Sequence, residues 1–278
     1  MTKFGKYFKY DGKTTEDFGL IIGSFENKTE TEIGLERSVD RGESNTYRTR
    51  ANHFGTYYDD VLTFEITLIK DPCKFSGEDL YFTRSETRKI NRWLTSSHYP
   101  ILFHMTDYDN HIIADEQVDY FGIFNSVEAH KAVNIAGLTF TFTCDSPFAY
   151  SSVKEEVITS ETSVNSIIYN DSDEAHDYVY PLLKITPNID GIITIKNETD
   201  SNGTMDINCL IGNVVYIDAQ KLKVTDLAGG LISFEKLGIN DVDNIYWMRF
   251  CSGENKIKII GNATVRFTWR EARKVGAY

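Results

Sequence analysis

The stretch Leu138-Thr-Phe-Thr-Phe-Thr-Cys144 carries the clearest structural signal in the chain. Apolar residues occupy every second position and threonines fill the positions between them, which is the period of a half-buried β-strand. The strand leads into Asp145-Ser-Pro-Phe-Ala-Tyr150, where Pro147 has no amide hydrogen to donate to a neighbouring strand. Pairing is therefore expected to end here, and the strand is predicted to be the last of a compact domain.

The length of 278 residues allows two domains, because a typical domain has about 150 residues. We place the first at residues 1–150 and the second at 151–278, with Pro147, Phe148 and Tyr150 at the domain junction. Hydrophobic residues make up 41% of the chain, so both domains can bury a core. The 17 phenylalanines and 16 tyrosines favour strands over helices, and the predicted fold class is mainly β.

One amphipathic helix is expected in the first domain. Thr83 and Glu86 have the spacing of a capping box, in which their side chains accept hydrogen bonds from the free N–H groups at the helix start. Ile90, Trp93 and Leu94 then follow the i, i+3, i+4 rule and share one face. We interpret these three residues as the anchor that holds the helix on the core.

The segment between Glu36 and Arg50 is unusually polar for a compact domain, and it allows two interpretations. One is a mobile surface loop. The other is a protruding hairpin whose tip docks on a neighbouring subunit, which we favour because long structureless loops inside compact domains are uncommon. The candidate intersubunit residues of this hairpin are Arg41, Tyr47, Arg48 and Arg50.

The second domain is predicted to be a β-sandwich, because short apolar runs alternate with turn signals and no helical stripe occurs. Gly212-Asn213 separates Ile207–Ile211 from Val214–Asp218, and this two-residue spacing indicates a β-hairpin. Ser151, Ser152 and the charged segment Lys154–Glu156 are interpreted as the linker that precedes it.

Enzyme and metal-site motifs are absent from the sequence. The histidines make no His-Glu-x-x-His pattern, and Asp107-Tyr-Asp-Asn-His111 is better explained as a polar β-turn than as a calcium loop. We therefore assign no catalytic residues, no metal ligands and no cofactor. The widely spaced Cys73, Cys144, Cys209 and Cys251 are expected to be reduced thiols.

The charge balance limits the possible partners. A net charge of −12 without a basic stripe argues against specific nucleic-acid binding, which depends on neutralising phosphates. No apolar stretch approaches the ~20 residues that span a bilayer, so membrane insertion is not expected.

Several weak marks in order along the chain produce a family resemblance. Phe8–Gly12, Asp17–Ile22, Arg88–Leu94 and Cys144–Tyr150 together resemble the distal tail protein family of long-tailed phages that infect Gram-positive bacteria. Tyr180–Ile185 opens a second half that is similar to the galectin-like domain of this family. The resemblance implies an N-terminal β-sandwich or split-barrel-like ring-forming domain with one α-helix, followed by a galectin-like C-terminal β-sandwich.

The resemblance also implies a function. Members form a homo-hexameric hub at the tail tip that leaves a channel for DNA and assembles in the host cytoplasm. The implied partners are the major tail tube protein, the tape measure protein and the tail-associated lysin or tip hub protein. Receptor-binding proteins are a further candidate. The alternative is a carbohydrate-binding module that aids host adsorption. Galectins bind sugar through a His, Asn and Arg set with a stacking Trp, and here His176 lies far in sequence from Trp247 and Trp269.

Overall fold

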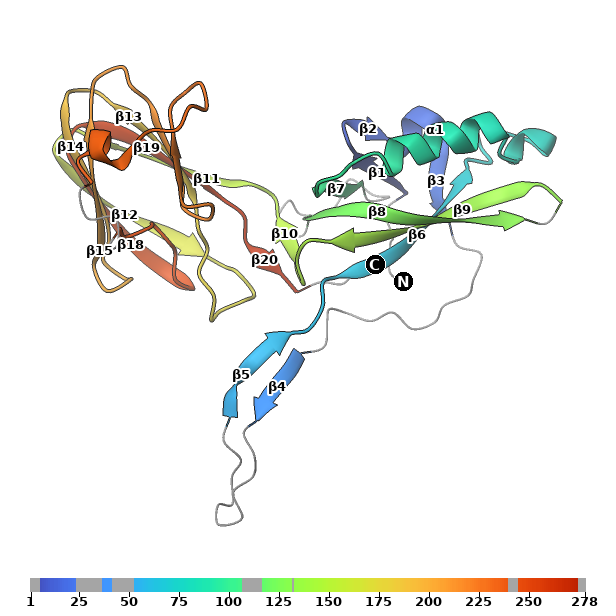
Figure 1. The fold of residues 1–278 in the computed structure, drawn as a ribbon, viewed down its shortest axis with the longest axis horizontal. Helices are drawn as coiled ribbons and strands as arrows, with labels where there is room; N and C mark the ends of the chain where they lie inside the picture. Colours follow the sequence, from blue (N-terminus) through green and yellow to red (C-terminus); the bar gives the residue numbers. More distant parts are fainter. Residues whose placement is uncertain are drawn as a thin grey trace, which may run out of the picture. The chain divides into compact units, whose positions relative to one another are not determined.

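The computed structural model describes residues 6–23, 37–41, 53–106, 117–131, 133–239 and 245–274 (Figure 1). The described chain divides into two compact units. The first unit contains the residues up to Tyr150 together with Lys274, and the second unit runs from Ser151 to Arg273. Lys274, which the sequence analysis placed in the second domain, groups with the first unit because its ammonium lies 6.0 Å from the ring centre of Phe148.

The first unit is built on one antiparallel sheet with the strand order β2-β1-β7-β8-β9-β6-β3. Ile22 in β3 donates a backbone hydrogen bond of 3.0 Å to the carbonyl of Lys6, just before β1, so the two ends of the sheet approach each other. The sheet therefore curls into a split barrel. Its strands are β1 (Tyr7–Tyr10), β2 (Lys13–Thr14), β3 (Leu20–Gly23), β6 (Thr63–Lys70), β7 (Ile101–Thr106), β8 (Val118–Lys131) and β9 (Ile135–Cys144).

The strand that opened the sequence analysis is β9, and its alternation is confirmed. Leu138, Phe140, Phe142 and Cys144 are buried in the core of the first unit. The intervening threonines lie on the opposite face, where the hydroxyl of Thr139 is 2.6 Å from that of Thr67 on β6.

The helix α1 (Arg84–Leu94) lies across one side of this sheet (Figure 1). Its capping box is formed by Thr83 and Glu86 as predicted. Ile90, Trp93 and Leu94 are the buried residues of the helix. The Trp93 ring stacks on Phe18 at 4.7 Å between centres, and its Nε1 donates a 3.0 Å hydrogen bond to a backbone carbonyl in β1. The helix thus packs on the core of the first unit through Ile90, Trp93 and Leu94.

The second unit consists of two antiparallel sheets whose inner faces share one core, which makes it a β-sandwich. The five-stranded sheet has the order β11-β19-β13-β16-β17 and the four-stranded sheet the order β12-β18-β14-β15. The strands are β11 (Lys154–Ser160), β12 (Ser163–Asn170), β13 (Leu182–Pro187), β14 (Gly191–Asn197), β15 (Gly203–Cys209), β16 (Val215–Asp218), β17 (Lys223–Thr225), β18 (Gly253–Ile260) and β19 (Ala263–Trp269).

The remaining elements are short. Two strands, β4 (Arg37–Arg41) and β5 (His53–Tyr58), form a separate two-stranded sheet in the first unit. The strands β10 (Ala149–Ser151) and β20 (Ala272–Arg273) lie where the chain passes between the units. The 3₁₀ turns are η1 (Thr15–Phe18), η2 (Gly77–Leu80) and η4 (Phe234–Leu237).

Two expectations for the second unit are wrong. Gly212-Asn213 does not close a hairpin, because β15 pairs with β14 in one sheet whereas β16 pairs with β13 in the other. The chain crosses between the sheets here, so that both strands bury apolar side chains from opposite sides of one core. The charged segment at Lys154 is not a linker either: it begins β11, an edge strand of the five-stranded sheet.

Candidate functional site

The hairpin of β4 and β5 is the first candidate site, because none of its described side chains is buried. Its strands are antiparallel, with a β-bulge after Asp40. Phe54 and Tyr57 are 67% and 55% exposed, and Val39 is exposed as well. A two-stranded ribbon with no covered face is marginally stable in water, so these exposed rings mark a surface suited to packing against another chain. Of the two interpretations, the antiparallel pairing of β4 and β5 agrees with a hairpin. Docking of this hairpin on a neighbouring subunit stays a prediction.

The predicted intersubunit residues are placed only in part. Arg41 is the last residue of β4, and its side chain lies outside the described residues. Tyr47, Arg48 and Arg50 also lie outside them. The exposed aromatic residues on the strands were not predicted, although the polar composition of the segment had indicated that it contributes little to the core of its own subunit.

The base of the hairpin packs against the predicted domain junction. Arg37 donates a 2.5 Å hydrogen bond to the hydroxyl of Thr56, and its guanidinium lies 5.3 Å from the ring centre of Tyr58. The Tyr58 ring in turn makes a T-shaped contact with Phe148, at 4.9 Å between centres. The two ends of this contact are 90 positions apart in the sequence, so it fixes the start of the hairpin on the end of the first unit.

The junction residues themselves are partly buried. Pro147, Phe148 and Tyr150 are all half-buried, and the Phe148 amide donates a 3.1 Å hydrogen bond to the hydroxyl of Ser146. The Tyr150 ring packs edge-on against Phe121 at 5.8 Å. Burial raises the pKa of Tyr150, so its phenol stays neutral. The junction is therefore packed on the side of the first unit, and its tyrosine is uncharged at neutral pH.

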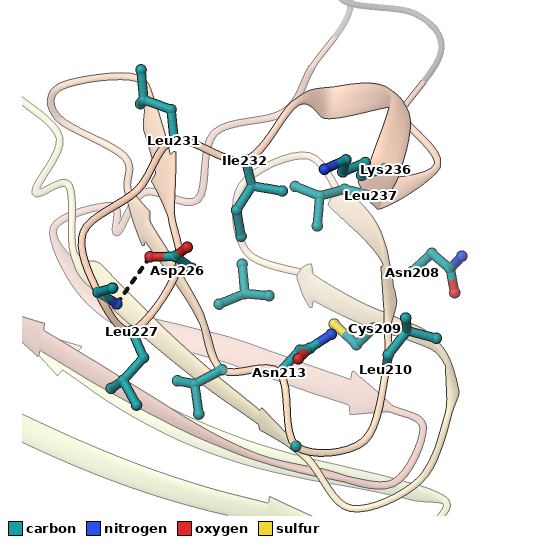
Figure 2. A pocket seen from close by; sticks show the side chains of 14 residues that line it. Asn208, Cys209, Leu210, Asn213, Asp226, Leu227, Leu231, Ile232, Lys236 and Leu237 are labelled. Atoms are coloured by element: carbon teal, nitrogen blue, oxygen red, sulfur yellow. Dashed lines mark hydrogen bonds between the residues drawn. The ribbon is translucent and has the colours of Figure 1, made fainter.

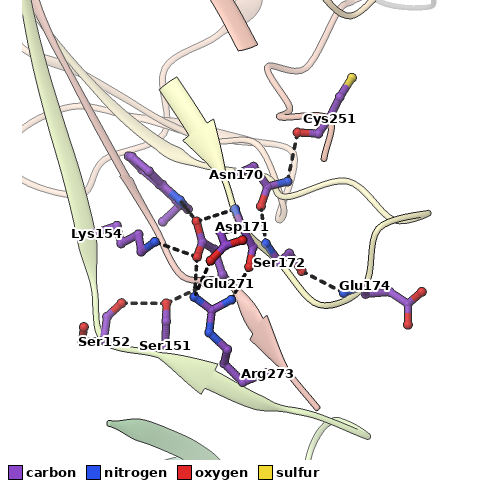
Figure 3. Close-up of polar contacts among 11 residues, drawn as sticks. Ser151, Ser152, Lys154, Asn170, Asp171, Ser172, Glu174, Cys251, Glu271 and Arg273 are labelled. Carbon is purple, nitrogen blue, oxygen red and sulfur yellow. Dashed lines mark hydrogen bonds and ion pairs between the residues drawn. The ribbon is translucent and has the colours of Figure 1, made fainter. Parts of the chain in front are cut away.

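The second unit contains a fully buried carboxylate, Glu271, close to Ser151 and Arg273 (Figure 3). Its carboxylate accepts from Lys154 Nζ at 2.8 Å and Arg273 Nη2 at 2.8 Å. The Asp171 amide and Trp269 Nε1 also donate to Oε1, at 3.1 and 3.3 Å. Burial alone would raise the pKa of Glu271, but these donors outweigh it and lower the pKa below its ordinary value. The buried carboxylate is therefore ionised at neutral pH.

The same cluster joins the first and last residues of the second unit. The Ser151 amide donates to the Glu271 carbonyl at 2.8 Å, and the Glu271 amide donates to the Ser151 hydroxyl at 3.0 Å. Arg270 Nη1 donates to the Ser151 carbonyl at 2.8 Å. The sequence analysis missed this cluster, because Ser151 and Glu271 are 120 residues apart and no local pattern links them.

A second charged cluster lies elsewhere in the second unit. The nearly buried Asp200 accepts from Arg249 Nε at 2.7 Å, from Arg249 Nη2 at 3.3 Å and from the Tyr246 hydroxyl at 2.9 Å. The Arg249 guanidinium also lies 3.9 Å from the ring centre of Tyr178, within cation–π range. The hydrogen bond from Arg249 lowers the pKa of Asp200. This arrangement satisfies every group and leaves none poised for proton transfer.

One cavity of about 560 Å³ lies at the edge of the sandwich, and we call it the edge cavity (Figure 2). It forms where the chain crosses from β15 to β16, under the loop that leads from β17 to η4. Its walls are mainly apolar. The lining includes Leu210, Leu227, Leu231, Ile232 and Leu237, with Asn208, Asn213 and Lys236 among the polar groups. The volume lies in the range of ligand-binding cavities.

No catalytic or metal-binding constellation is found in the described part of the chain. No group of three His, Cys, Asp or Glu residues there is arranged to hold a metal ion. Burial raises the pKa of Cys144 to about 12 and that of Cys209 to about 11, so neither forms a reactive thiolate near neutral pH. The predicted polar turn at Asp107–His111 lies outside the described residues. Among the described helices, none has the length and apolar character needed to cross a membrane.

Comparison with protein families assigns the chain to phage tail proteins. The model of a phage tail protein N-terminal domain matches residues 3–146, and the model of a phage tail C-terminal domain matches residues 148–269. The first match alone covers more than half of the chain, so the protein belongs to this family of phage tail proteins. No curated protein sequence matches it.

Solved structures share the fold over nearly the full length. The chain superposes on the Dit protein (gp 19.1) of phage SPP1, described as a paradigm of the hub adsorption apparatus in phages that infect Gram-positive bacteria, with a TM-score of 0.64. The match covers 95% of this chain and 98% of that protein at 12% identity. A chain of the phage P2 baseplate in its activated conformation with Ca matches with a TM-score of 0.57, at 10% identity, over 99% and 100% of the two chains. The protein therefore has the fold of these tail proteins, and the predicted resemblance is confirmed.

Proposed function

We propose that this phage tail protein is the hub at the distal end of the tail tube. In this proposal six copies form a ring through the first unit, leave a channel for DNA, and join the tube to the tip or baseplate proteins. The observation that supports it most is the fold match to the SPP1 hub protein, because it includes both units and leaves almost no residue of either chain unmatched. The partners are the major tail tube protein, the tape measure protein and the tail-associated lysin or tip hub protein, and the ring assembles in the host cytoplasm before it enters the virion.

The hairpin supplies the contact between subunits in this proposal. Its exposed aromatic residues need a surface to pack against, and a neighbouring copy around a closed ring provides the same surface six times. The net charge of −12 per chain suits a conduit, because an acidic wall repels DNA that must pass through it.

Light scattering and negative-stain microscopy of the purified protein test the proposal. The expected result is a ring with six times the 31.7 kDa mass of one chain. The double variant Phe54→Ser, Tyr57→Ser should remain folded and become monomeric, as should a deletion of residues 39–50. Tyr99→Ser is the matched control, because Tyr99 is 79% exposed but lies outside the hairpin. A wild-type monomer at high concentration with the tube or tip protein present contradicts the hub. An intact ring in the double variant contradicts the hairpin as the contact between subunits.

The proposed hub is not an enzyme, and its second unit, galectin-like in our interpretation, is a platform for proteins. The lectin alternative needs an exposed aromatic ring for the sugar. Trp269 is buried and Trp247 packs against Phe234 at 6.0 Å. The exposed rings described in this unit include Tyr169, at 64%, and the neighbouring Tyr178 and Tyr180, at 38% and 37%. Saturable calorimetric binding of host wall polysaccharide, lost in Tyr180→Ala, would favour the lectin. Clearing of purified cell wall by the protein alone would show it to be a hydrolase.

A further inference from the structure

Exposed leucines gather around the edge cavity. Leu227 and Leu231 are 70% and 77% exposed, and Leu210 on the opposite rim is also exposed. Inside, Ile232 and the buried Leu237 continue the apolar wall (Figure 2). Large aliphatic side chains that line a cavity and also extend over its rim are typical of a binding surface, because a free monomer gains nothing from exposing them together.

Lys236 supplies the one ammonium among the residues that line the edge cavity. Lys236 makes no side-chain hydrogen bond or ion pair within the described part of the chain, and the same holds for the side-chain amides of Asn208 and Asn213. The carboxylate of Asp226 is already occupied, because it accepts from the amides of Ala228 and Gly230 at 2.9 and 2.7 Å. The Lys236 ammonium, which has no partner among the described residues, is therefore the charged group open to an occupant, and a carboxylate is the group that it complements. The asparagine amides can donate or accept a hydrogen bond.

The shape indicates an extended occupant. A small molecule inside the cavity would leave Leu227 and Leu231 in water, whereas a peptide that passes over the rim covers them. The cavity also adjoins β15, which is the last strand of its sheet, the position at which peptides often add to a sheet.

We propose that the edge cavity binds an acidic peptide segment of a partner protein. An apolar side chain of the segment enters between Ile232 and Leu237, and a neighbouring carboxylate pairs with Lys236. The identity of the partner as another tail protein rests on the proposed function, whereas the binding site itself does not.

Fluorescence polarisation with the full-length protein tests this site. The probe is a labelled hexapeptide with a leucine–phenylalanine centre and two glutamates on each side, and the comparison peptide has lysines in place of the glutamates. The acidic peptide should bind saturably despite the net charge of −12, and it should bind at least tenfold more weakly to Leu231→Asp and to Lys236→Glu. Leu222→Asp is the matched control, because Leu222 is 58% exposed and does not line the cavity.

Three outcomes overturn the proposal. The first is that the acidic peptide does not bind the wild-type protein, or that it binds Leu231→Asp, Lys236→Glu and Leu222→Asp with equal affinity. The second is that dodecanoate binds the cavity whereas the peptide does not, which would make the ligand lipid-like. The third is self-association that Leu231→Asp abolishes, which would make a second copy the occupant. Ring formation is measured on the same samples: a ring without peptide binding refutes only this inference, and peptide binding without a ring refutes only the hub.

Discussion

The first unit packs its core with aromatic rings, whereas the second unit fills the space between its sheets mainly with aliphatic side chains. Rings in the first core include Phe8, Tyr10, Phe82, Trp93, Phe103, Tyr120, Phe124, Phe140 and Phe142. The second core holds Phe250, Phe267 and Trp269 among many isoleucines and valines. Two sheets of a sandwich pack about 10 Å apart, and in the second unit branched aliphatic side chains from both inner faces fill that layer. In the first unit the rings pack against one another, as Phe103 does on Phe142 at 4.9 Å between centres.

The two units also differ in where they bury charge. The second unit holds the ionised Glu271 and Asp200 in networks that connect distant parts of its chain. The first unit buries Lys70, which pairs with the more exposed Glu86 at the start of α1, and the two carboxylates of Asp71 and Asp119. Lys6 Nζ lies 3.9 Å from Asp71, and His104 Nδ1 lies 2.6 Å from Asp119. We infer that aromatic packing is the main source of stability in the first unit, and that the second unit depends more on paired charges. Each prediction below tests one side of this difference.

The largest effect is expected for Trp93→Ala. Removing the ring leaves a cavity between α1 and the sheet and one unpaired carbonyl in β1, which should lower the free energy of unfolding of the first unit by about 4 kcal/mol. In calorimetry of the full chain, the melting temperature of the first unit should fall, and that of the second unit should stay unchanged. Trp247→Ala is the control and should affect only the second unit. A joint shift of both transitions in either variant would mean that the units do not unfold independently.

Glu271→Gln is expected to destabilise the second unit by about 3 kcal/mol, because Lys154 and Arg273 lose their shared counter-charge in a buried place. Denaturant titration followed by Trp fluorescence measures the change. If buried charge is unimportant in this unit, the variant will unfold at the same denaturant concentration as the wild type.

The same carboxylate sets a pH dependence with a defined sign. The folded-state pKa of Glu271 is lowered, so its contribution is fully present above the unfolded value of about 4.3 and is lost as the pH falls through the folded value. The stability difference between wild type and Glu271→Gln should therefore shrink below about pH 4. A difference that stays constant from pH 7 to pH 3 would contradict ionisation of the buried group.

The features predicted from sequence were local ones. The alternation of β9, the capping box at Thr83 and the anchor face of α1 each depend on residues within a few positions of one another, where periodicity and backbone geometry decide the structure. The crossing at Gly212-Asn213 was missed, because its sequence suits a tight turn equally well whether the flanking strands pair or part.

The candidate sites were predictable to a smaller extent. The hairpin was found because its polarity excluded it from the core, but which of its residues are exposed depends on strand register. The Glu271 cluster and the edge cavity bring together residues from distant segments, such as Lys154 with Glu271, and this juxtaposition is set by the sandwich topology. No alternation or spacing in the local sequence contains that information.

Asp200→Asn should destabilise the second unit by about 2 kcal/mol. This is less than Glu271→Gln, because Arg249 stays partly in water and can recover some solvation. The Tyr246 hydroxyl keeps an acceptor in the amide oxygen, so the loss comes from the bidentate pair with Arg249. Chemical denaturation measures the loss, and Arg249→Met in the Asp200→Asn background should add little. Additive losses in the double variant would show that the two residues do not act as a pair.

Thr83→Ala should lower the stability of the first unit by about 1 kcal/mol. The variant removes the hydroxyl that accepts a hydrogen bond from the Glu86 amide at the start of α1. The Glu86 carboxylate still accepts a hydrogen bond from the backbone amide of residue 83. Thr83→Ser keeps the acceptor and serves as the control. Equal melting temperatures of the Ala and Ser variants would show that the packing of Trp93 holds the helix without help from its cap.

The smallest effect is expected for Glu155→Gln, and it isolates burial as the variable. Glu155 is adjacent to Lys154 on β11 and pairs with Arg266 at 3.0 Å, a distance close to the 2.8 Å between Lys154 and Glu271. Both partners of the Glu155 pair are nearly half exposed, so water and salt screen them and the loss should be at most about 0.5 kcal/mol. Denaturant titration at low and high salt measures it next to Glu271→Gln. The two pairs each use a residue of β11 and have similar distances. An equally large loss of stability in Glu155→Gln and Glu271→Gln would therefore show that strand pairing, and not burial of charge, sets the stability of the second unit.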